Sequence, residues 1–211
     1  IGLVNRHGID TIAAYGITQQ LWNYVQMPAM AIGAAVSAMA AQNIGAGRWD
    51  RVARITRAGL GYNIAMTGTM VALVVLFDRP LLALFIGGGS PVIPVAQHIN
   101  LIVTWGLILF GATMVLFGTV RANGAVWGPL IILAVSMFPV RLGLALSLDP
   151  VWGANALWWS FPLGSIVNLV LAVLYYLYGP WRRAGLLVPE EHVGERSHAD
   201  IEPAANLHPV S

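Results

Sequence analysis

The sequence predicts an all-α integral membrane protein, a bundle of helices that crosses the bilayer several times. Residues 11–47 contain no Asp, Glu, Lys or Arg, and comparable uncharged stretches recur at 58–77, 80–120 and 150–181. Apolar residues make up 57% of the chain and charged residues only 9%, whereas an average soluble domain is about 25% charged. A soluble fold of this size has too little interior for these stretches, so most of the chain is expected to lie in hydrocarbon.

A membrane-spanning helix needs about 20 predominantly apolar residues. By that measure the chain has five complete spans, at about 13–42, 58–77, 96–120, 126–148 and 155–178. Residues 1–4 are interpreted as the last turn of an earlier, sixth helix, and the first residue is Ile. We therefore expect that the chain lacks its natural beginning.

The first span is long enough to require tilt or a bend, and Pro28 predicts a bend because proline removes a backbone donor. Gln19, Asn23 and Gln26 precede it at spacings of four and three, which places them on one helical face. Such amides either form hydrogen bonds between helices or line a wet cleft for substrate.

The ends and packing of the early spans are expected to depend on glycine. Gly45 and Gly47 are predicted to stop the first helix and to admit left-handed backbone. Gly59, Gly61 and Gly68 are expected to allow close approach of the second span to its neighbours.

Two segments are predicted to lie outside the spans. The connection 78–95 contains an apolar run, three consecutive glycines and two later prolines, and is interpreted as a short surface turn followed by a flexible loop. The chain divides into a membrane lobe at 1–185 and a tail at 186–211, which is acidic, contains prolines and is expected to be disordered and cytoplasmic.

The distribution of arginine predicts the orientation. Three arginines, Arg6, Arg79 and Arg141, belong to one side, and seven belong to the other side: Arg48, Arg51, Arg54, Arg57, Arg121, Arg182 and Arg183. The positive-inside rule then places the first connection, the third connection and the C-terminus in the cytoplasm. Trp49, Trp127 and Trp181 are expected at the inner membrane boundary.

Arg141 is the one formal charge well inside a predicted span. An intramembrane arginine normally faces a bundle interior or water, which makes a functional role the default hypothesis. The alternative is that its long side chain reaches the outer headgroups or a carbonyl at a helix end.

Several segments together resemble the multidrug and toxic compound extrusion (MATE) transporters. The stretches 28–35 and 42–47 resemble the second half of that family, 118–124 is similar to a short inner connection, and 139–142 resembles the arginine-bearing part of its next-to-last helix. Residues 152–154 and 157–159 are similar to the approach to its last helix. The resemblance covers about residues 1–185 in order.

This resemblance implies the second lobe of a twelve-helix transporter in the bacterial inner membrane. The family exports hydrophobic or cationic compounds in exchange for H⁺ or Na⁺. None of the five spans contains Asp or Glu, and the helix at 96–120 offers Gly111, Ala112 and Thr113 where some members place a coupling carboxylate. We therefore expect the coupling ion to bind in a missing N-terminal lobe.

The predicted partners are membrane lipids, that missing lobe and small hydrophobic or cationic substrates. Candidate residues of the substrate cleft are Gln19, Asn23, Tyr24, Gln26, Trp105, Thr113, Met114 and Arg141.

Other functions compete with drug export. A flippase for lipids or polysaccharide precursors should have a more cationic cavity than Arg141 alone provides, and a non-transporting membrane scaffold is the other alternative. An enzyme is not expected, because no buried carboxylate pair, activated nucleophile or metal-ligand spacing is recognisable. We expect no cofactor and no metal, and the net charge of +2 does not indicate nucleic-acid binding.

Overall fold

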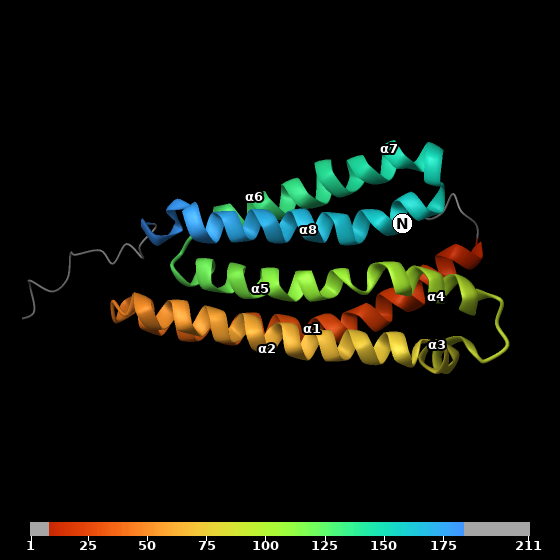
Figure 1. The fold of residues 1–211 in the computed structure, drawn as a ribbon, viewed down its shortest axis with the longest axis horizontal. Coiled ribbons are helices and arrows are strands. Elements are labelled where there is room, and N and C mark those ends of the chain that lie inside the picture. The colour runs from red at the N-terminus through yellow and green to blue at the C-terminus, as the bar shows by residue number, and fades with distance from the viewer. Residues whose placement is uncertain (1–8, 184–211) are drawn as a thin grey trace, which may run out of the picture.

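The computed structural model describes residues 9–183, and this part of the chain is helical (Figure 1). The helices follow one another as α1 (Ile9–Gly45), α2 (Trp49–Leu76), α3 (Asp78–Ile86), α4 (Val92–Val103), α5 (Gly106–Ala122), α6 (Trp127–Val135), the π-helical segment η2 (Ser136–Leu142), α7 (Gly143–Trp152), α8 (Ala154–Tyr178) and the 3₁₀ turn η3 (Pro180–Arg183). The predicted end of a sixth helix at 1–4 and the tail at 186–211 lie outside the described residues.

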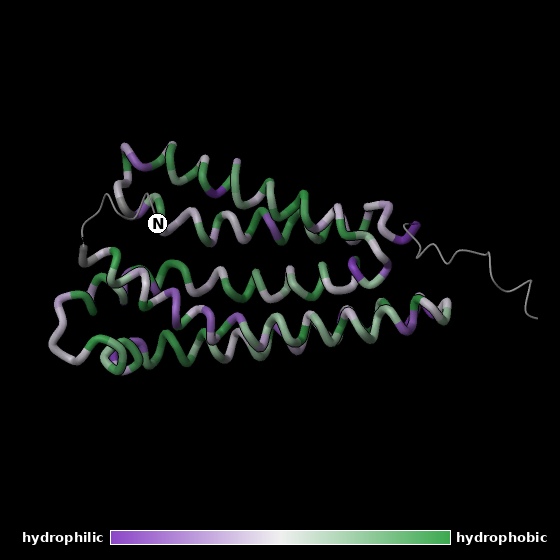
Figure 2. The backbone as a smooth tube through the Cα atoms, turned by 180° about the vertical axis from the view of Figure 1, so that it is seen from behind, coloured by the Kyte–Doolittle hydropathy of each residue, from purple (hydrophilic) through white to green (hydrophobic). Residues whose placement is uncertain are grey.

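The long helices lie side by side as one elongated bundle (Figure 1). The α5 helix lies between the α1–α2 pair and α8, and it packs against all three. The continuous rod of α6, η2 and α7 lies against α8 on the far side. Figure 2 shows hydrophobic residues over most of the length of the helices, as expected for rods that face lipid.

Four helices of the described part are long and apolar enough to cross a membrane: 11–45, 49–76, 127–152 and 155–178. The pair α4 and α5 passes the same test together, although the two helices are bent by 44° relative to each other. The prediction of an all-α membrane protein is therefore confirmed. Five spans result when the bent pair is counted as one.

The second span begins earlier than predicted. Helix α2 starts at Trp49 rather than near residue 58, so Arg51, Arg54 and Arg57 lie inside the helix and not in a connection. Hydropathy marks the part of a helix that lies in lipid, and a helix continues past that part for as long as its backbone bonds allow. Arg54 pairs with Asp50 one turn away, at 2.8 Å.

The third span is broken, which the sequence analysis did not predict. The backbone turns at Thr104 and Trp105, where the Thr104 hydroxyl donates to the Asn100 carbonyl oxygen at 2.5 Å. Such bonds from Thr to the preceding turn bend helices. Gly106 then packs closely on α8, since a Cβ there would lie 3.3 Å from the Cα of Pro162. Because of the break and this close contact, the first turns of α5 pack against α8.

The connection at 78–95 is more ordered than predicted. Residues 78–86 form the helix α3, and Leu82 is fully buried in the main core instead of lying on the surface. Residues 92–95 belong to α4, so the loop itself spans only 87–91. The loop begins at Gly87, whose φ of +84° needs glycine.

Close helix contacts depend on a different set of glycines from the predicted one. A Cβ on Gly118 of α5 would lie 2.5 Å from the carbonyl oxygen of Gly33 in α1, and a Cβ on Gly59 of α2 would lie 2.4 Å from Val36. Gly59 therefore acts as predicted. The prediction for Gly61 and Gly68 is wrong, because a Cβ at either position would meet nothing within 4 Å.

The α1–α2 turn, the α5–α6 turn and η3 gather at one end of the bundle (Figure 1). As predicted, α1 ends at Gly45, and Gly47 is left-handed with φ of +69°. Trp181 in η3, which was predicted at the inner membrane boundary, is buried inside the bundle. Its indole N–H donates to the Tyr176 carbonyl oxygen at 2.7 Å, and Asn123 donates to the Trp181 carbonyl oxygen at 2.7 Å. These bonds fasten the end of α8 to the α5–α6 turn.

Candidate functional site

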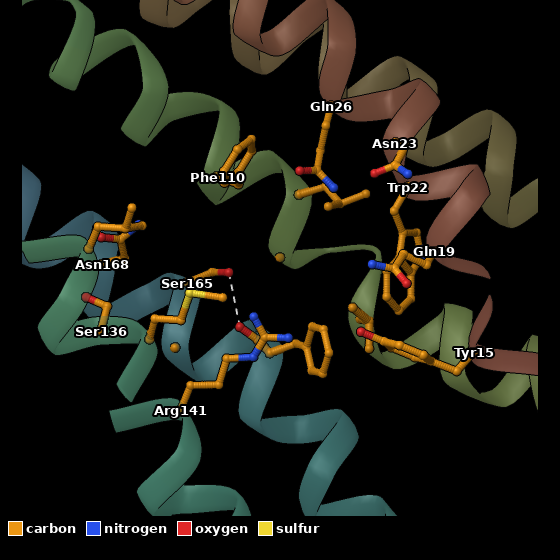
Figure 3. Close-up of a pocket in the computed structure, with 17 residues that line it drawn as sticks. Tyr15, Gln19, Trp22, Asn23, Gln26, Phe110, Ser136, Arg141, Ser165 and Asn168 are labelled. Atoms are coloured by element: carbon orange, nitrogen blue, oxygen red, sulfur yellow. Dashed lines mark hydrogen bonds between the residues drawn. The ribbon is translucent and has the colours of Figure 1, made fainter. Parts of the chain in front are cut away.

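A cavity of about 360 Å³ opens between α1, the α4–α5 break, the α6–η2 rod and α8 (Figure 3). Drug-sized ligands occupy cavities of roughly this size or larger, usually about 300–1,000 Å³. The cavity lies in the half of the bundle nearer α3, because α1 lines it before Pro28 and α8 lines it within its first 15 residues. The opposite end of the bundle, where the α1–α2 turn, the α5–α6 turn and η3 gather, carries the seven arginines predicted to be cytoplasmic and is called the seven-arginine end.

The polar wall of the cavity comes from α1. Gln19, Asn23 and Gln26 line it together, as expected for residues on one helical face. Tyr24 does not line it, because its side chain is 51% exposed on another face and accepts a bond from Gln20 at 3.4 Å. The structure thus separates Tyr24 from the other three α1 candidates.

The aromatic wall joins α1 to α8. Trp22, Tyr15 and Phe161 line the cavity, with ring centroids 6.0 Å apart for Tyr15 and Trp22 and 5.7 Å apart for Trp22 and Phe161. Trp158 stacks on Tyr15 from behind at 5.8 Å. Packed rings of this kind give an apolar surface that is held in place.

Trp22 is fixed by a polar network at the α3 end of the bundle. Its indole N–H donates to Asn100 Oδ1 at 3.0 Å, and the Asn100 amide donates to Asp78 Oδ1 at 3.2 Å. Asn100 is 1% exposed. Partial burial raises the pKa of Asp78 above its usual value, while the hydrogen bonds from Asn100 and Gln97 act in the opposite direction.

The α4–α5 break supplies Val103, Gly106, Leu107 and Phe110 to the cavity. The three residues predicted on this helix lie elsewhere. Trp105 is 53% exposed on the outside, and Thr113 is fully buried and donates to the Leu109 carbonyl oxygen at 2.9 Å. Met114 packs in a hydrophobic cluster with Leu116 and Phe117. The break explains this outcome, because the cavity meets only the first turns of α5.

The η2 segment brings Arg141 to the cavity. π-Helical turns are rare and occur frequently at functional sites, and η2 contains Pro139, which has no backbone N–H. The Arg141 guanidinium lies over the ring of Phe161, with Cζ 3.4 Å from the ring centroid. Gly164 makes room for it, since a Cβ there would lie 3.3 Å from Arg141 Cβ. The side chain therefore crosses to α8 (Figure 3).

Two lining residues that the sequence analysis missed are Ser136 of η2 and Asn168 of α8. Ser136 is 4% exposed and Asn168 is 7% exposed, and neither Ser136 Oγ nor Asn168 Oδ1 has a hydrogen-bond partner. A polar residue inside an apolar span was the available signal, because such residues usually face a bundle interior. An unpaired buried polar atom is costly unless water or a ligand meets it.

Pro28 lies inside α1, beyond the cavity. One residue later the Ala29 carbonyl oxygen accepts a bond from Asn63 of α2 at 3.0 Å, and Asn63 Oδ1 accepts one from Thr67 at 3.0 Å. Asn63 is fully buried. Pro28 thus lies next to a polar contact between α1 and α2, and the bend predicted there stays a prediction.

Among residues 9–183, no group of three or more His, Asp or Glu side chains is placed to hold a metal ion. The cavity itself is lined by amides, hydroxyls, aromatic rings and one guanidinium.

Helices long and apolar enough to span a membrane, packed around a polar and aromatic cavity, define a multi-pass helical membrane protein. The family model described as MatE matches residues 1–146, and the chain belongs to the MatE family. The resemblance predicted from the sequence is thereby confirmed.

The chain is 33% identical over 185 residues to the probable multidrug resistance protein YoeA of Bacillus subtilis, covering 87% of this chain and 40% of that protein. It is 30% identical over 182 residues to the probable multidrug resistance protein YpnP of the same organism, covering 86% and 41%. It is 27% identical over 186 residues to the probable multidrug resistance protein NorM of Deinococcus radiodurans, covering 83% and 40%. The chain thus spans about two fifths of the curated relatives that it matches. No solved structure shows a significant match.

Proposed function

We propose that this chain is the second lobe of a secondary active transporter that exports drugs and other hydrophobic toxic compounds from a bacterial cell. The observation that carries the proposal is the cavity between α1, α5, η2 and α8, which combines aromatic walls with amide and hydroxyl groups. Sites of this composition hold drug-sized molecules. Membership of the MatE family and the names of the three relatives support the same function.

The arrangement of the helices supports transport as well. Substrate sites of secondary transporters are typically formed by discontinuous helices at the interface of two repeats. Here the cavity meets the α4–α5 break on one side and the π-helical η2 segment on the other. In the proposal, this lobe and a first lobe rock against each other around a shared site.

The proposed coupling is antiport with H⁺ or Na⁺, and the ion binds in the first lobe. An exchanged ion needs an ionisable group at depth in the membrane. Within residues 11–183, Asp50, Asp78 and Asp149 are the acidic residues, and none of them lines the cavity. The seven-arginine end is proposed to face the cytoplasm, which directs the cavity half of the bundle outward.

A flippase for lipids or polysaccharide precursors is the second candidate. Such a substrate carries several phosphate or acidic groups, whereas the cavity of this lobe offers the single charge of Arg141. Drug export therefore fits this lobe better.

Dye export from cells tests the proposed function. Cells that express the full-length protein are loaded with the uncharged dye Nile red, and efflux is followed by fluorescence with the proton gradient or the sodium gradient collapsed in turn. We expect efflux to stop when one of the two gradients is collapsed, and we expect Gln19→Leu to slow efflux. Gln20→Leu is the matched control, because Gln20 adjoins Gln19 but does not line the cavity. Efflux that equals the vector control in every arm would refute the proposal.

A further inference from the structure

We propose that the cavity binds the acidic group of an amphipathic organic anion at Arg141, so that the preferred substrates are aromatic compounds that carry one carboxylate or a similar oxyanion. The inference rests on the proposed export function and names a substrate class for it. It departs from the expectation of cationic substrates.

The charge of the cavity is the first observation. Of the 17 residues that line it, Arg141 alone carries a charge, and the others are apolar, aromatic, hydroxyl, amide or glycine residues. An arginine remains charged at every physiological pH. The charge of the cavity therefore favours an anion over a cation.

The free edge of the guanidinium is the second observation. One face of the Arg141 guanidinium is covered by the Phe161 ring at 3.4 Å, and no ion pair joins Arg141 to another described residue. The N–H groups of a guanidinium lie in its plane, so a ring on its face leaves them available. In Figure 3 the guanidinium nitrogens point into the space between α8 and α1. A carboxylate matches this edge with two parallel hydrogen bonds.

The unpaired buried polar atoms of the same cavity are the third observation. Ser136 Oγ and Asn168 Oδ1 line the same cavity without a partner, although both residues are more than nine-tenths buried. Further polar groups of a ligand in this cavity would satisfy both, because a hydroxyl can donate or accept and the amide oxygen can accept. The unpaired atoms are thus part of a built polar subsite, separate from the α1 amides.

The aromatic wall supplies the rest of the site. Tyr15 and Trp22 line the cavity from α1 and Phe110 lines it from α5 (Figure 3). Phe161 of α8 also lines it and lies against the Arg141 guanidinium. Rings stack on flat apolar bodies and bury large areas. The site therefore fits a molecule with an aromatic body and one acidic group.

Binding of three ligands with one aromatic body tests the proposal. The purified full-length protein in detergent is titrated by calorimetry with 2-naphthoate, with its neutral amide and with 2-naphthylmethylamine. We expect naphthoate to bind at least tenfold more tightly than the amide and the amine most weakly. Arg141→Gln should abolish the difference between naphthoate and the amide, and Arg141→Lys should retain part of it. Arg57→Gln is the matched control, because it removes one positive charge outside the cavity.

The ligand series on the unaltered protein keeps the test decisive if Arg141→Gln does not fold. Naphthoate that binds no more tightly than the amide overturns the proposal. A repeat in nanodiscs with and without phosphatidylglycerol separates a soluble acid from a lipid headgroup, and loss of naphthoate binding with that lipid would also overturn it. Nile red export without naphthoate preference would leave the export function standing, whereas naphthoate preference without any export would leave only the binding site.

Discussion

Trp22 and Asn100 form a buried hydrogen bond of 3.0 Å between α1 and α4. Asn100 is also bonded to Asp78 at the start of α3 and to Thr104 at the α4–α5 break. One amide thus connects the aromatic wall of the cavity with the bend of the third span. The cavity depends on this connection for its shape, because a wall residue and the break share one partner.

Replacing Trp22 with phenylalanine removes the indole donor and keeps an aromatic ring. We expect the free energy of unfolding to fall by about 1 kcal/mol, the usual net value of one intramolecular hydrogen bond. Thermal unfolding of the full-length protein in detergent measures the effect. Trp105→Phe is the control, because Trp105 is 53% exposed and lies outside the cavity. Equal losses for the two variants would contradict a special role of Trp22.

Asp78 predicts a pH dependence of stability. Because burial raises its pKa in the folded protein, the folded state holds more protons than the unfolded state between the ordinary pKa and the raised one. Stability therefore falls as pH rises through that window and levels off above it. Asp78→Asn should remove this fall because asparagine does not titrate. Its side-chain oxygen can still accept from Asn100, so the hydrogen bond is kept.

Melting temperatures of the full-length protein between pH 4 and pH 8 check the Asp78 prediction. Asp50→Asn is the control, because Asp50 is exposed and pairs only with Arg54 at the surface, where ion pairs contribute little. If Asp78→Asn and the unaltered protein show the same dependence of melting temperature on pH, groups other than Asp78 cause that dependence.

The helices were predictable and their interruptions were not. Hydropathy located the apolar stretches because lipid demands them over a fixed length. It gave no sign that Thr104 bends the third span or that η2 is π-helical, since both depend on local hydrogen bonds and on contacts with α8. For this reason Trp105, Thr113 and Met114 lie outside the cavity, and their place in a substrate cleft stays a prediction.

The cavity was predictable only where periodicity fixed a helical face. Gln19, Asn23 and Gln26 share a face at any bend angle, and the structure brings them together. Tyr24 follows Asn23 directly and therefore points elsewhere. The partners of Arg141 come from α8. The sequence alone does not show which helices pack together, so it cannot show that Phe161 and Gly164 lie opposite Arg141.

Gly118→Ala should destabilise the contact between α5 and α1. A Cβ at Gly118 would lie 2.5 Å from the Gly33 carbonyl oxygen, and backbone atoms cannot yield as a flexible side chain does. Overpacking of this kind costs about 1–3 kcal/mol. Gly61→Ala is the control in α2, where a Cβ meets nothing within 4 Å and alanine favours the helix by about 1 kcal/mol. The melting temperatures of both variants are measured by thermal unfolding. Equal decreases for Gly118→Ala and Gly61→Ala would contradict the Gly33–Gly118 contact.

Trp181→Ala should destabilise the protein far more than Trp127→Ala, although both residues were predicted to lie in one interfacial belt. Trp181 is 1% exposed, stacks on Tyr176 at 5.3 Å and donates to its carbonyl oxygen, whereas Trp127 is 76% exposed. Removing a buried tryptophan side chain costs about 3–5 kcal/mol, while an exposed one at a bilayer surface loses only its interfacial contact. Thermal unfolding of the full-length variants in detergent compares them. Detergent micelles also provide an apolar–polar interface, so an interfacial anchor would still contribute to stability there. Equal losses of stability in the two variants would therefore mean that Trp181 acts as such an anchor and not as a part of the core that joins α8 to the α5–α6 turn.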